Sequence, residues 1–356
     1  MTAAVIFLAA AGGAILTFVS GRFLSRRAWL SDRPGPRSSH AKATPRTGGV
    51  CVMIGFLIAA LGVTRFDPEG LKFIALTAGA FALGLADDVR SLPAAVKLAG
   101  QVAIASLFVF VFGSVDIVPA PFLGEVSLGA LAPALTIFWI VAFMNAYNFM
   151  DGANGLAATA AIFALSALGV AAAGGGEAVW AGLCVVLAAS IFGFLPLNFP
   201  KALLFLGDGG SQAIGFAAAS LAALVAKTDA ASALFLPTAF MPFLFDVAFT
   251  LVHRAARRRP LAEAHNEHLY QLLIRLGASH TVVTAAYLAL TVIATLAAIL
   301  GAPLPASVQF VIPAALLGAF AVPAIMIFAK AKAAGLLAAG AGPAKPKVRP
   351  IARAAE

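Results

Sequence analysis

The sequence has little charge and almost no cysteine. Asp, Glu, Lys and Arg make up only 11% of its 356 residues, whereas 62% of the residues are hydrophobic. A typical soluble domain is about a quarter charged, so a water-soluble fold could not bury this much apolar surface. The two cysteines, Cys51 and Cys184, both lie inside apolar runs, which indicates neither a disulfide framework nor a cysteine metal site.

Long polar segments are also missing. Apolar runs recur from the first residue to about residue 330, which predicts a single transmembrane domain over 1–330 and a basic, disordered cytoplasmic tail over 331–356. The predicted fold class is an all-α integral membrane protein, a polytopic bundle of about eleven transmembrane helices. The predicted spans lie near residues 2–20, 47–64, 71–86, 96–113, 128–146, 153–172, 178–196, 211–226, 231–252, 281–300 and 307–330.

Three of these spans are unusual. The runs at 71–86 and 211–226 are short, and Pro242 interrupts the run at 231–252. A short or proline-broken helix leaves backbone groups that lipid cannot satisfy. These three segments are therefore expected to pack against neighbouring helices.

The basic residues predict the orientation. A net charge of +9 could indicate a nucleic-acid binder, but Lys and Arg fall in short loops between apolar runs, so no nucleic-acid partner is expected. When successive loops are assigned to alternate sides, all but three of the 24 Lys and Arg residues share one side; the exceptions are Arg65, Lys72 and Lys227. Because positive residues accumulate in the cytoplasm, we expect the N-terminus to lie outside and the C-terminus in the cytoplasm.

Two polar segments on the predicted cytoplasmic side favour anions and cations respectively. His40, Lys42 and Arg46 precede a Gly-Gly pair and form a basic loop suited to an anionic ligand; a simple positive-inside anchor is the alternative.

Asp87 and Asp88 end a span, where two carboxylates beside hydrocarbon are costly unless a cation or a function compensates. They indicate a divalent metal or a phosphate-handling base, with a solvated helix end as the alternative.

A third segment places Asn145, Asn148 and Asp151 three residues apart, near one face of a helix. Two amides and a carboxylate could orient a nucleotide, a sugar or a cation. Polar side chains that hold helices together are the alternative.

A fourth segment places Asn198 before Gly207-Asp208-Gly209-Gly210-Ser211, which opens a new span. Glycines let backbone amides approach a diphosphate at a helix N-terminus, and Asp208 could hold the Mg²⁺ that bridges phosphate oxygens. Gly-rich turns between helices are common, so this motif alone is weak.

The fifth segment is the longest cytoplasmic loop, and it carries four of the five histidines. Asp246 lies just before it, and His265 and His268 are three residues apart. The spacing would allow a metal pair, but no third ligand is evident. Imidazoles among arginines more naturally contact a diphosphate or a sugar.

Together and in this order, the five segments resemble the polyprenyl-phosphate N-acetylhexosamine-1-phosphate transferase superfamily, glycosyltransferase family 4. The resemblance covers about residues 30–280. It rests on the HxKxTPRxGG-like loop, the DD pair followed by Leu92-Pro93 and Lys97, the NxxNxxDGxNG and NFP…GDxGS segments, and the histidine loop. Residues 264–280 look most like the O-antigen-initiating branch. Ser91 stands where the family often has a third acidic or amide residue.

The resemblance implies a transmembrane catalytic domain with a cytoplasmic-facing active-site cleft. The implied reaction moves a sugar 1-phosphate, of the N-acetylhexosamine or 6-deoxy-N-acetylhexosamine type, from a UDP-sugar to undecaprenyl phosphate. UMP is released, Mg²⁺ is the cofactor with Mn²⁺ as a substitute, and the product begins a cell-envelope polysaccharide such as O-antigen. The implied location is the bacterial inner membrane, where membrane lipids would surround the enzyme, and a homodimer is left open.

The resemblance also implies residue roles. Asp87, Asp88, Asp151 and Asp208 are the expected catalytic residues. Asp208 and Asp88 are the expected metal ligands, and Asp87 or Asp88 would position or deprotonate the lipid phosphate. The expected substrate-binding residues are His40, Lys42, Arg46, Asn145, Asn148, Asn198, Gly207, His265 and His268.

A multi-span transporter or flippase of lipid-linked sugars is the main alternative. It predicts charged residues near the membrane midplane and internal repeats. The sequence has neither, because its acidic residues lie at span ends. A catalytically inactive scaffold is a third possibility, which the intact aspartates disfavour.

Overall fold

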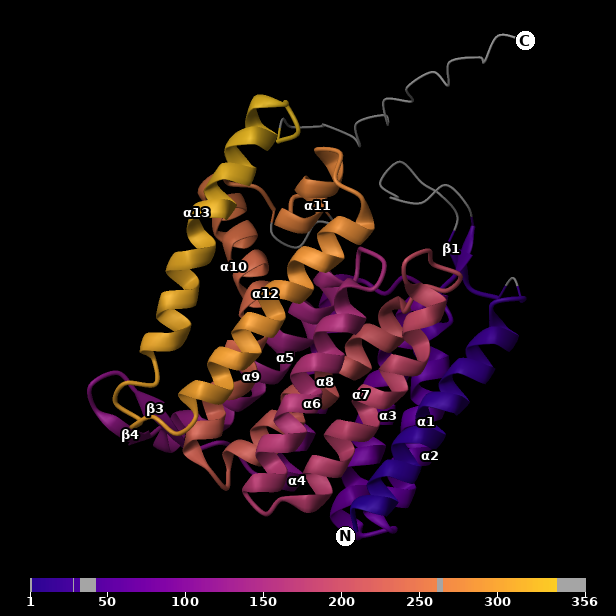
Figure 1. The fold of residues 1–356 in the computed structure, drawn as a ribbon, viewed down its shortest axis with the longest axis vertical. Coiled ribbons are helices and arrows are strands. Elements are labelled where there is room, and N and C mark those ends of the chain that lie inside the picture. Colours follow the sequence, from indigo (N-terminus) through magenta and orange to yellow (C-terminus); the bar gives the residue numbers. More distant parts are fainter. Residues whose placement is uncertain (1, 28, 33–42, 261–264, 338–356) are drawn as a thin grey trace.

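The computed structural model describes residues 2–27, 29–32, 43–260 and 265–337. Long helices run side by side in alternating directions and form one bundle (Figure 1). The α-helices are α1 (Ala3–Leu24), α2 (Gly48–Thr64), α3 (Pro68–Val89), α4 (Ala94–Phe112), α5 (Ala132–Met150), α6 (Leu156–Gly174), α7 (Ala178–Asn198), α8 (Gly207–Ala226), α9 (Phe235–Ala239), α10 (Met241–Ala256), α11 (Leu269–Arg275), α12 (His280–Gly301) and α13 (Val311–Ala333).

Four short strands and two 3₁₀ turns complete the described part of the chain. β1 (Ser31–Asp32) pairs antiparallel with β2 (Thr44–Pro45), and β3 (Ile117–Ala120) pairs antiparallel with β4 (Gly124–Ser127). The two small sheets lie at opposite ends of the bundle (Figure 1). The 3₁₀ turns are η1 (Gly129–Leu131) and η2 (Ala230–Leu234).

The predicted count of about eleven spans is too high for the described residues. Nine of their helices are long and apolar enough to cross a membrane, or ten if the bent pair around Phe240 counts as one span. The predicted span at 47–64 is the 17-residue helix α2, about 25 Å long at 1.5 Å per residue, which is short for a bilayer core of about 30 Å. The predicted span at 231–252 is broken by a bend of 69° between α9 and α10.

Helix α8 forms the centre of the bundle. Every residue in its apolar window is buried, which confirms the prediction for the short run at 211–226, and Pro242 at the start of α10 is buried as well. Helix α3 differs, because only 33% of its window is buried. Most side chains of α8 are Gly, Ala or Ser, and small side chains let neighbouring helix backbones approach closely.

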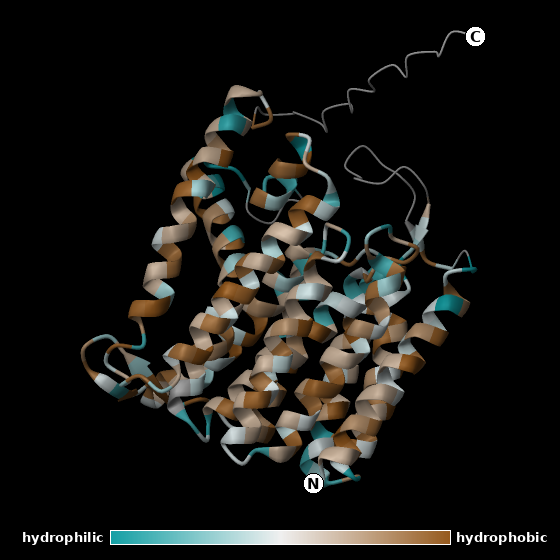
Figure 2. Cartoon of the chain, viewed as in Figure 1, coloured by the Kyte–Doolittle hydropathy of each residue, from teal (hydrophilic) through white to brown (hydrophobic). Residues whose placement is uncertain are grey.

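Polar residues gather at the helix ends. Figure 2 shows hydrophobic colours along the helices and hydrophilic colours mainly at the two ends of the bundle. The C-terminal ends of α3, α5 and α10 lie at the same end as the N-terminal ends of α2, α4 and α8, since successive helices alternate in direction. Arg65, Lys72 and Lys227 lie at the other end, near the ends of α2, α3 and α8.

Regular structure continues beyond the predicted domain boundary at residue 330. Helix α13 continues to Ala333, and Leu336 and Leu337 in the following turn are buried. Residues 331–337 are helix and turn in the structure and pack against an apolar surface, and the predicted disordered tail stays a prediction. Residues 338–356 lie outside the described part.

Candidate active site

At the end of the bundle that carries the acidic residues, the backbones of α2, α3 and α8 lie in close contact. A Cβ added to Gly84 of α3 would lie 2.3 Å from the Asp208 carbonyl oxygen of α8. A Cβ added to Gly49 of α2 would lie 2.3 Å from the backbone nitrogen of Gly210. Only glycine allows these approaches. The glycines therefore bring the end of α3 against the start of α8.

Lys97 of α4 lies between two predicted catalytic carboxylates. Its Nζ atom is 2.5 Å from Asp87 Oδ2 and 2.8 Å from Asp208 Oδ2. The Asp87 side chain is 9% exposed and its Oδ1 atom accepts the Leu92 backbone N–H at 2.7 Å. From the sequence, Lys97 was part of the motif but was not among the predicted site residues. The signal that could have identified it is a lone cation near the start of an apolar span.

Asp88 has a different environment from its neighbour. Its Oδ1 atom accepts the backbone N–H of Asp208 at 3.0 Å, and its Oδ2 atom accepts that of Gly209 at 2.8 Å. Gly207 has φ of +75°, and a Cβ there would lie 2.7 Å from Asp88 Oδ2. Asp88 thus caps the N-terminus of α8 from another helix.

This cap corrects the interpretation of the GDGGS segment. The sequence suggested that its backbone amides approach a diphosphate. The amides of Asp208 and Gly209 instead bind a carboxylate of the protein itself. The site therefore presents side chains rather than these two amides.

Two amide side chains of α5 contact neighbouring helices. Asn148 donates a hydrogen bond from Nδ2 to Ser211 Oγ at 2.7 Å. Asn145 donates from Nδ2 to Gln101 Oε1 at 2.7 Å, and Gln101 donates from Nε2 to Gln212 Oε1 at 3.3 Å. Gln101 is four residues after Lys97, and Gln212 is four after Asp208, so this amide layer lies one helical turn deeper than the charged groups. Gln101 and Gln212 are both buried, and sequence analysis did not single them out.

Asp151 follows the end of α5, three residues after Asn148, which contacts Ser211 of α8. Burial, together with the negative charges of Asp208 and Asp88, raises its pKa well above the usual range for aspartate. The positive charge of Arg46 opposes this shift. Asp151 therefore belongs to the same cluster as the acids of α3 and α8.

Arg46 is held by a network of backbone hydrogen bonds. Its own N–H donates to the Leu30 carbonyl at 2.9 Å. On either side of it, the Phe205 N–H donates to the Pro45 carbonyl and the Gly48 N–H donates to the Phe205 carbonyl. The Arg46 segment thus lies alongside the chain that leads into α8. His40 and Lys42, predicted in the same loop, lie outside the described residues.

Asn198 has an internal role in the structure. Its buried side chain accepts the Gly155 N–H through Oδ1 at 2.6 Å and donates from Nδ2 to the Leu204 carbonyl at 2.9 Å. Both ends of the amide are therefore engaged in joining two loops. This geometry positions the loops, and the predicted contact of Asn198 with substrate stays a prediction.

His265 and His268 lie together just before α11. Their ring centroids are 4.9 Å apart, although they precede a helix instead of lying on one. His268 is buried, and its Nδ1 atom is 3.3 Å from Asp246 Oδ1. Burial, with the positive charges of His268 and Arg254 nearby, lowers the pKa of His265 to about 4.

The histidines are linked to the acidic cluster through α5. The ring of His268 stacks on Phe149 with centroids 5.7 Å apart, and Tyr270 Oη donates to the Phe149 carbonyl at 2.9 Å. A Cβ added to Gly152 would lie 2.0 Å from Tyr270 Oη, so a larger residue beside Asp151 would displace the Tyr270 side chain. The structure thus brings the histidines and all four predicted catalytic aspartates to one end of the bundle.

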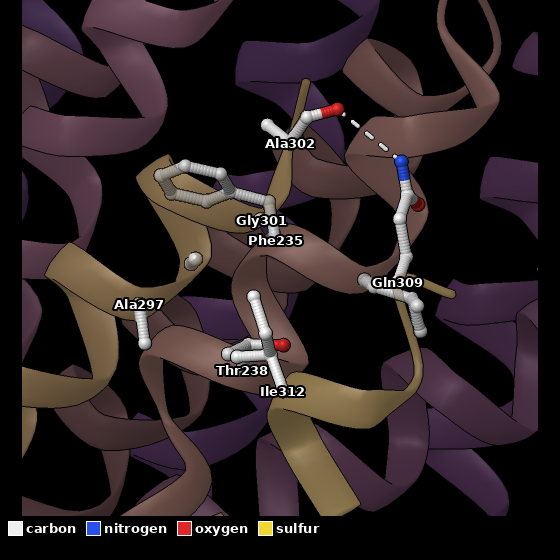
Figure 3. Close-up of a pocket in the computed structure, with 9 residues that line it drawn as sticks. Phe235, Thr238, Ala297, Gly301, Ala302, Gln309 and Ile312 are labelled. Carbon is white, nitrogen blue, oxygen red and sulfur yellow. Dashed lines mark hydrogen bonds between the residues drawn. The ribbon is translucent and has the colours of Figure 1, made fainter. Parts of the chain in front are cut away.

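Two cavities lie at the opposite end. The smaller, about 20 Å³, is lined by residues of α9, α12 and the chain around Gln309, which donates to the Ala302 carbonyl (Figure 3). The larger, about 190 Å³, is mostly apolar and includes Trp139 and Thr136. Neither contains a predicted site residue, so the predicted cleft at the acidic cluster stays a prediction.

The fold and the site define a polytopic membrane protein with a centre suited to phosphate chemistry at one end of its bundle. Comparison with known proteins agrees with this class. Residues 71–226, which include all four predicted catalytic aspartates, match the model of glycosyl transferase family 4.

Three relatives support the match over most of the chain. A probable undecaprenyl-phosphate N-acetylglucosaminyl 1-phosphate transferase from Bacillus subtilis is 34% identical over 255 residues, 70% of this chain and 71% of the relative. A decaprenyl-phosphate N-acetylglucosaminephosphotransferase from Mycobacterium tuberculosis is 32% identical over 351 residues, covering 84% and 87%. An undecaprenyl-phosphate alpha-N-acetylglucosaminyl 1-phosphate transferase from Thermotoga maritima is 30% identical over 259 residues, covering 72% and 77%. The chain belongs to glycosyl transferase family 4 and is a multi-pass membrane enzyme, which confirms the resemblance noted in its sequence.

Proposed function

We propose that the protein transfers N-acetylglucosamine 1-phosphate from UDP-N-acetylglucosamine to a polyprenyl phosphate, with undecaprenyl phosphate as the first candidate. The names of the three relatives support the transferred N-acetylglucosamine 1-phosphate and the polyprenyl phosphate acceptor. The observation that carries the proposal is the position of Lys97 between Asp87 and Asp208. Lys97, together with Arg46, whose charge acts on Asp88 and Asp151, and with a bound divalent cation, would balance the charges of the carboxylates and of two phosphate-bearing substrates.

The reaction makes one bond and breaks one. An oxygen of the lipid phosphate bonds to the sugar-bearing phosphorus of the donor, and the bond from that phosphorus to the bridging oxygen breaks to release UMP. Such a transfer depends mainly on positioning and on neutralising charge. Lys97 and Arg46 would neutralise phosphate oxygens, and Asn148 and Asp151 would orient the donor. Because a phosphate monoester is largely ionised at pH 7, Asp87 would position the acceptor and Lys97 rather than act as an essential base.

The residues present fit Mg²⁺ bound together with a substrate. Mg²⁺ is usually held by one or two carboxylates plus phosphate oxygens and water. Within residues 2–27, 29–32, 43–260 and 265–337, no group of three acidic, His or Cys side chains forms a ready-made cage. Asp208, 26% exposed, is the carboxylate that would hold the ion on the diphosphate, with Mn²⁺ as a substitute. The bound ion would supply charge neutralisation. Asp88 already accepts two backbone N–H groups, so we give it the capping role.

The basic residues support an orientation. We propose that the end with the acidic cluster faces the cytoplasm, with the N-terminus outside and the C-terminus inside, because the Lys and Arg residues of the described part lie at that end, apart from Arg65, Lys72 and Lys227. The product would begin a lipid-linked cell-envelope polysaccharide such as O-antigen.

The location of the charged groups favours transfer over transport. A transporter is expected to have charged residues deep in the membrane, whereas the layer of Gln101, Asn145 and Gln212 below the acidic cluster is neutral.

The test uses purified full-length protein, undecaprenyl phosphate and Mg²⁺ with UDP-N-acetylglucosamine, UDP-N-acetylgalactosamine or a UDP-linked 6-deoxy-N-acetylhexosamine. UMP release is measured for each donor. We expect release with UDP-N-acetylglucosamine that requires the lipid. A preference for another donor would overturn the sugar assignment, and no UMP from folded protein with any donor would overturn the transferase.

A further inference from the structure

Two arginines join the histidine loop to the end of the described chain. Arg259 forms an ion pair with Glu267 through Nη1 and donates from Nη2 to the Leu337 carbonyl at 2.6 Å. Arg275 donates from Nη1 to the Asn266 carbonyl at 2.9 Å and from Nη2 to the Leu336 carbonyl at 3.0 Å. Each planar guanidinium thus holds both the histidine loop and the turn after α13, which suits the rigid fork of arginine donors.

The turn after α13 is also held by packing. Leu336 and Leu337 are 9% and 5% exposed, and they form a small apolar cluster with Leu269, Leu272 and Phe328. This cluster is separate from the main core of the bundle. Helix α11 therefore rests on the end of α13, and Figure 1 shows the yellow end of α13 beside α11.

The residues held in this way lie between the two histidines. Asn266 and Glu267 separate His265 from His268, and Glu267 also pairs with Arg254 at 3.2 Å. On the other side of the segment, buried Asp246 accepts the backbone N–H groups of Leu269 and Tyr270 at 2.8 and 3.2 Å. The histidine segment, residues 265–268, is thus fixed on one side by α10 and on the other by the turn after α13.

We propose that residues 334–337, the C-terminal brace, position the histidine segment and through it the binding of the UDP-sugar donor. This inference rests on the proposed function. The brace touches no substrate; it limits where His265 and His268 lie relative to Asp151. Its acceptors are backbone carbonyls, so a side-chain substitution within the brace would leave them in place. Shortening the chain removes them.

The test compares two shortened proteins in detergent. A chain ending at Leu337 keeps both acceptors, and its new terminal carboxylate remains an acceptor for Arg259. A chain ending at Ala333 lacks the brace. Hydrogen exchange should rise at least tenfold for amides of residues 266–272 in the shorter chain, while those of α3 and α8 stay unchanged. Equal exchange in the two proteins would overturn the inference, and this result does not depend on turnover.

Kinetics then separate positioning from a purely structural role. We expect the chain ending at Ala333, and the full-length variant Arg275→Gln, to show a KM for UDP-N-acetylglucosamine raised about tenfold, with KM for undecaprenyl phosphate unchanged. Arg258→Gln, at an exposed arginine of the same loop, is the matched control. A fall in kcat that follows the loss of folded protein, with unchanged KM, would overturn the positioning role. Absence of UMP from the full-length protein would instead overturn the proposed function, and the exchange data would still decide the brace.

Discussion

Asp88 accepts the backbone N–H of Asp208 at 3.0 Å, so an acid at the end of α3 closes the start of the helix that carries another acid. Its neighbour Asp87 turns toward Lys97 instead. Two adjacent aspartates therefore have separate tasks. Asp88 stabilises the junction of α3 and α8, whereas Asp87 holds the Lys97 ammonium group, which also contacts Asp208.

Asp88→Asn should destabilise the protein more than Asp87→Asn. In the first variant an Nδ2 donor faces the N–H of Asp208 or Gly209, which leaves a backbone donor unsatisfied at a cost of about 1–3 kcal/mol. Thermal unfolding in detergent measures the difference. Equal melting temperatures for Asp88→Asn and the unchanged protein would contradict the capping role.

Lys97→Met should lower kcat/KM for UMP release by about 100-fold or more, because it removes the cation between Asp87 and Asp208 and leaves two carboxylates facing each other. Lys97→Arg keeps the charge and should retain more activity. Steady-state kinetics at saturating Mg²⁺ compare the two. Equal losses in both variants would show that charge is not the property that matters.

Asp208→Asn should abolish turnover without unfolding the protein, since the proposed ligand of Mg²⁺ loses its charge while the backbone cap from Asp88 remains. The measurement is UMP release across a Mg²⁺ titration, with EDTA-treated protein as the metal-free reference and Mn²⁺ as a replacement. Near-normal turnover at low Mg²⁺ would exclude Asp208 from the metal site.

His265 should make stability depend on pH. Its pKa in the folded protein is lowered from an ordinary 6.5 to about 4, while Arg254, His268, Glu267 and Asp246 surround it. Between these values the unfolded chain binds the proton and the folded chain does not, so stability is lost as the pH falls from 6.5 toward 4. The variant His265→Gln should lose less stability over this pH range, because it lacks the titrating imidazole.

Melting temperatures of the unchanged protein and His265→Gln at pH 6.5 and pH 4 provide the test. His280→Gln serves as a control at a histidine outside the histidine segment. The same decrease in all three proteins would contradict the assignment of this pH dependence to His265.

The apolar runs largely determined the fold, because helices in lipid must satisfy their own backbone hydrogen bonds and need a defined length. Each predicted run contains a helix. The sequence overestimated the spans because the short run at 47–64 was counted as a span, and because hydropathy does not register the bend between α9 and α10. The short strands escaped prediction because two to four residues carry too little pattern.

The types of residue in the site could also be predicted from their order. The polar segments pointed to the acids, the amides and the histidines, which the structure brings to one end of the bundle. Their individual tasks could not be predicted, since Asp87 and Asp88 are identical in type and adjacent in sequence. Only the packing of α3 against α8 directs one to Lys97 and the other to a helix terminus.

By itself, then, the sequence determined a membrane-embedded helical enzyme with polar residues at its helix ends, because hydropathy and local motifs need no long-range contact. The tertiary structure alone decided which groups meet. The contact of Lys97 with Asp208 and that of Arg275 with Leu336 join distant parts of the chain, and close glycine packing and buried apolar residues create them.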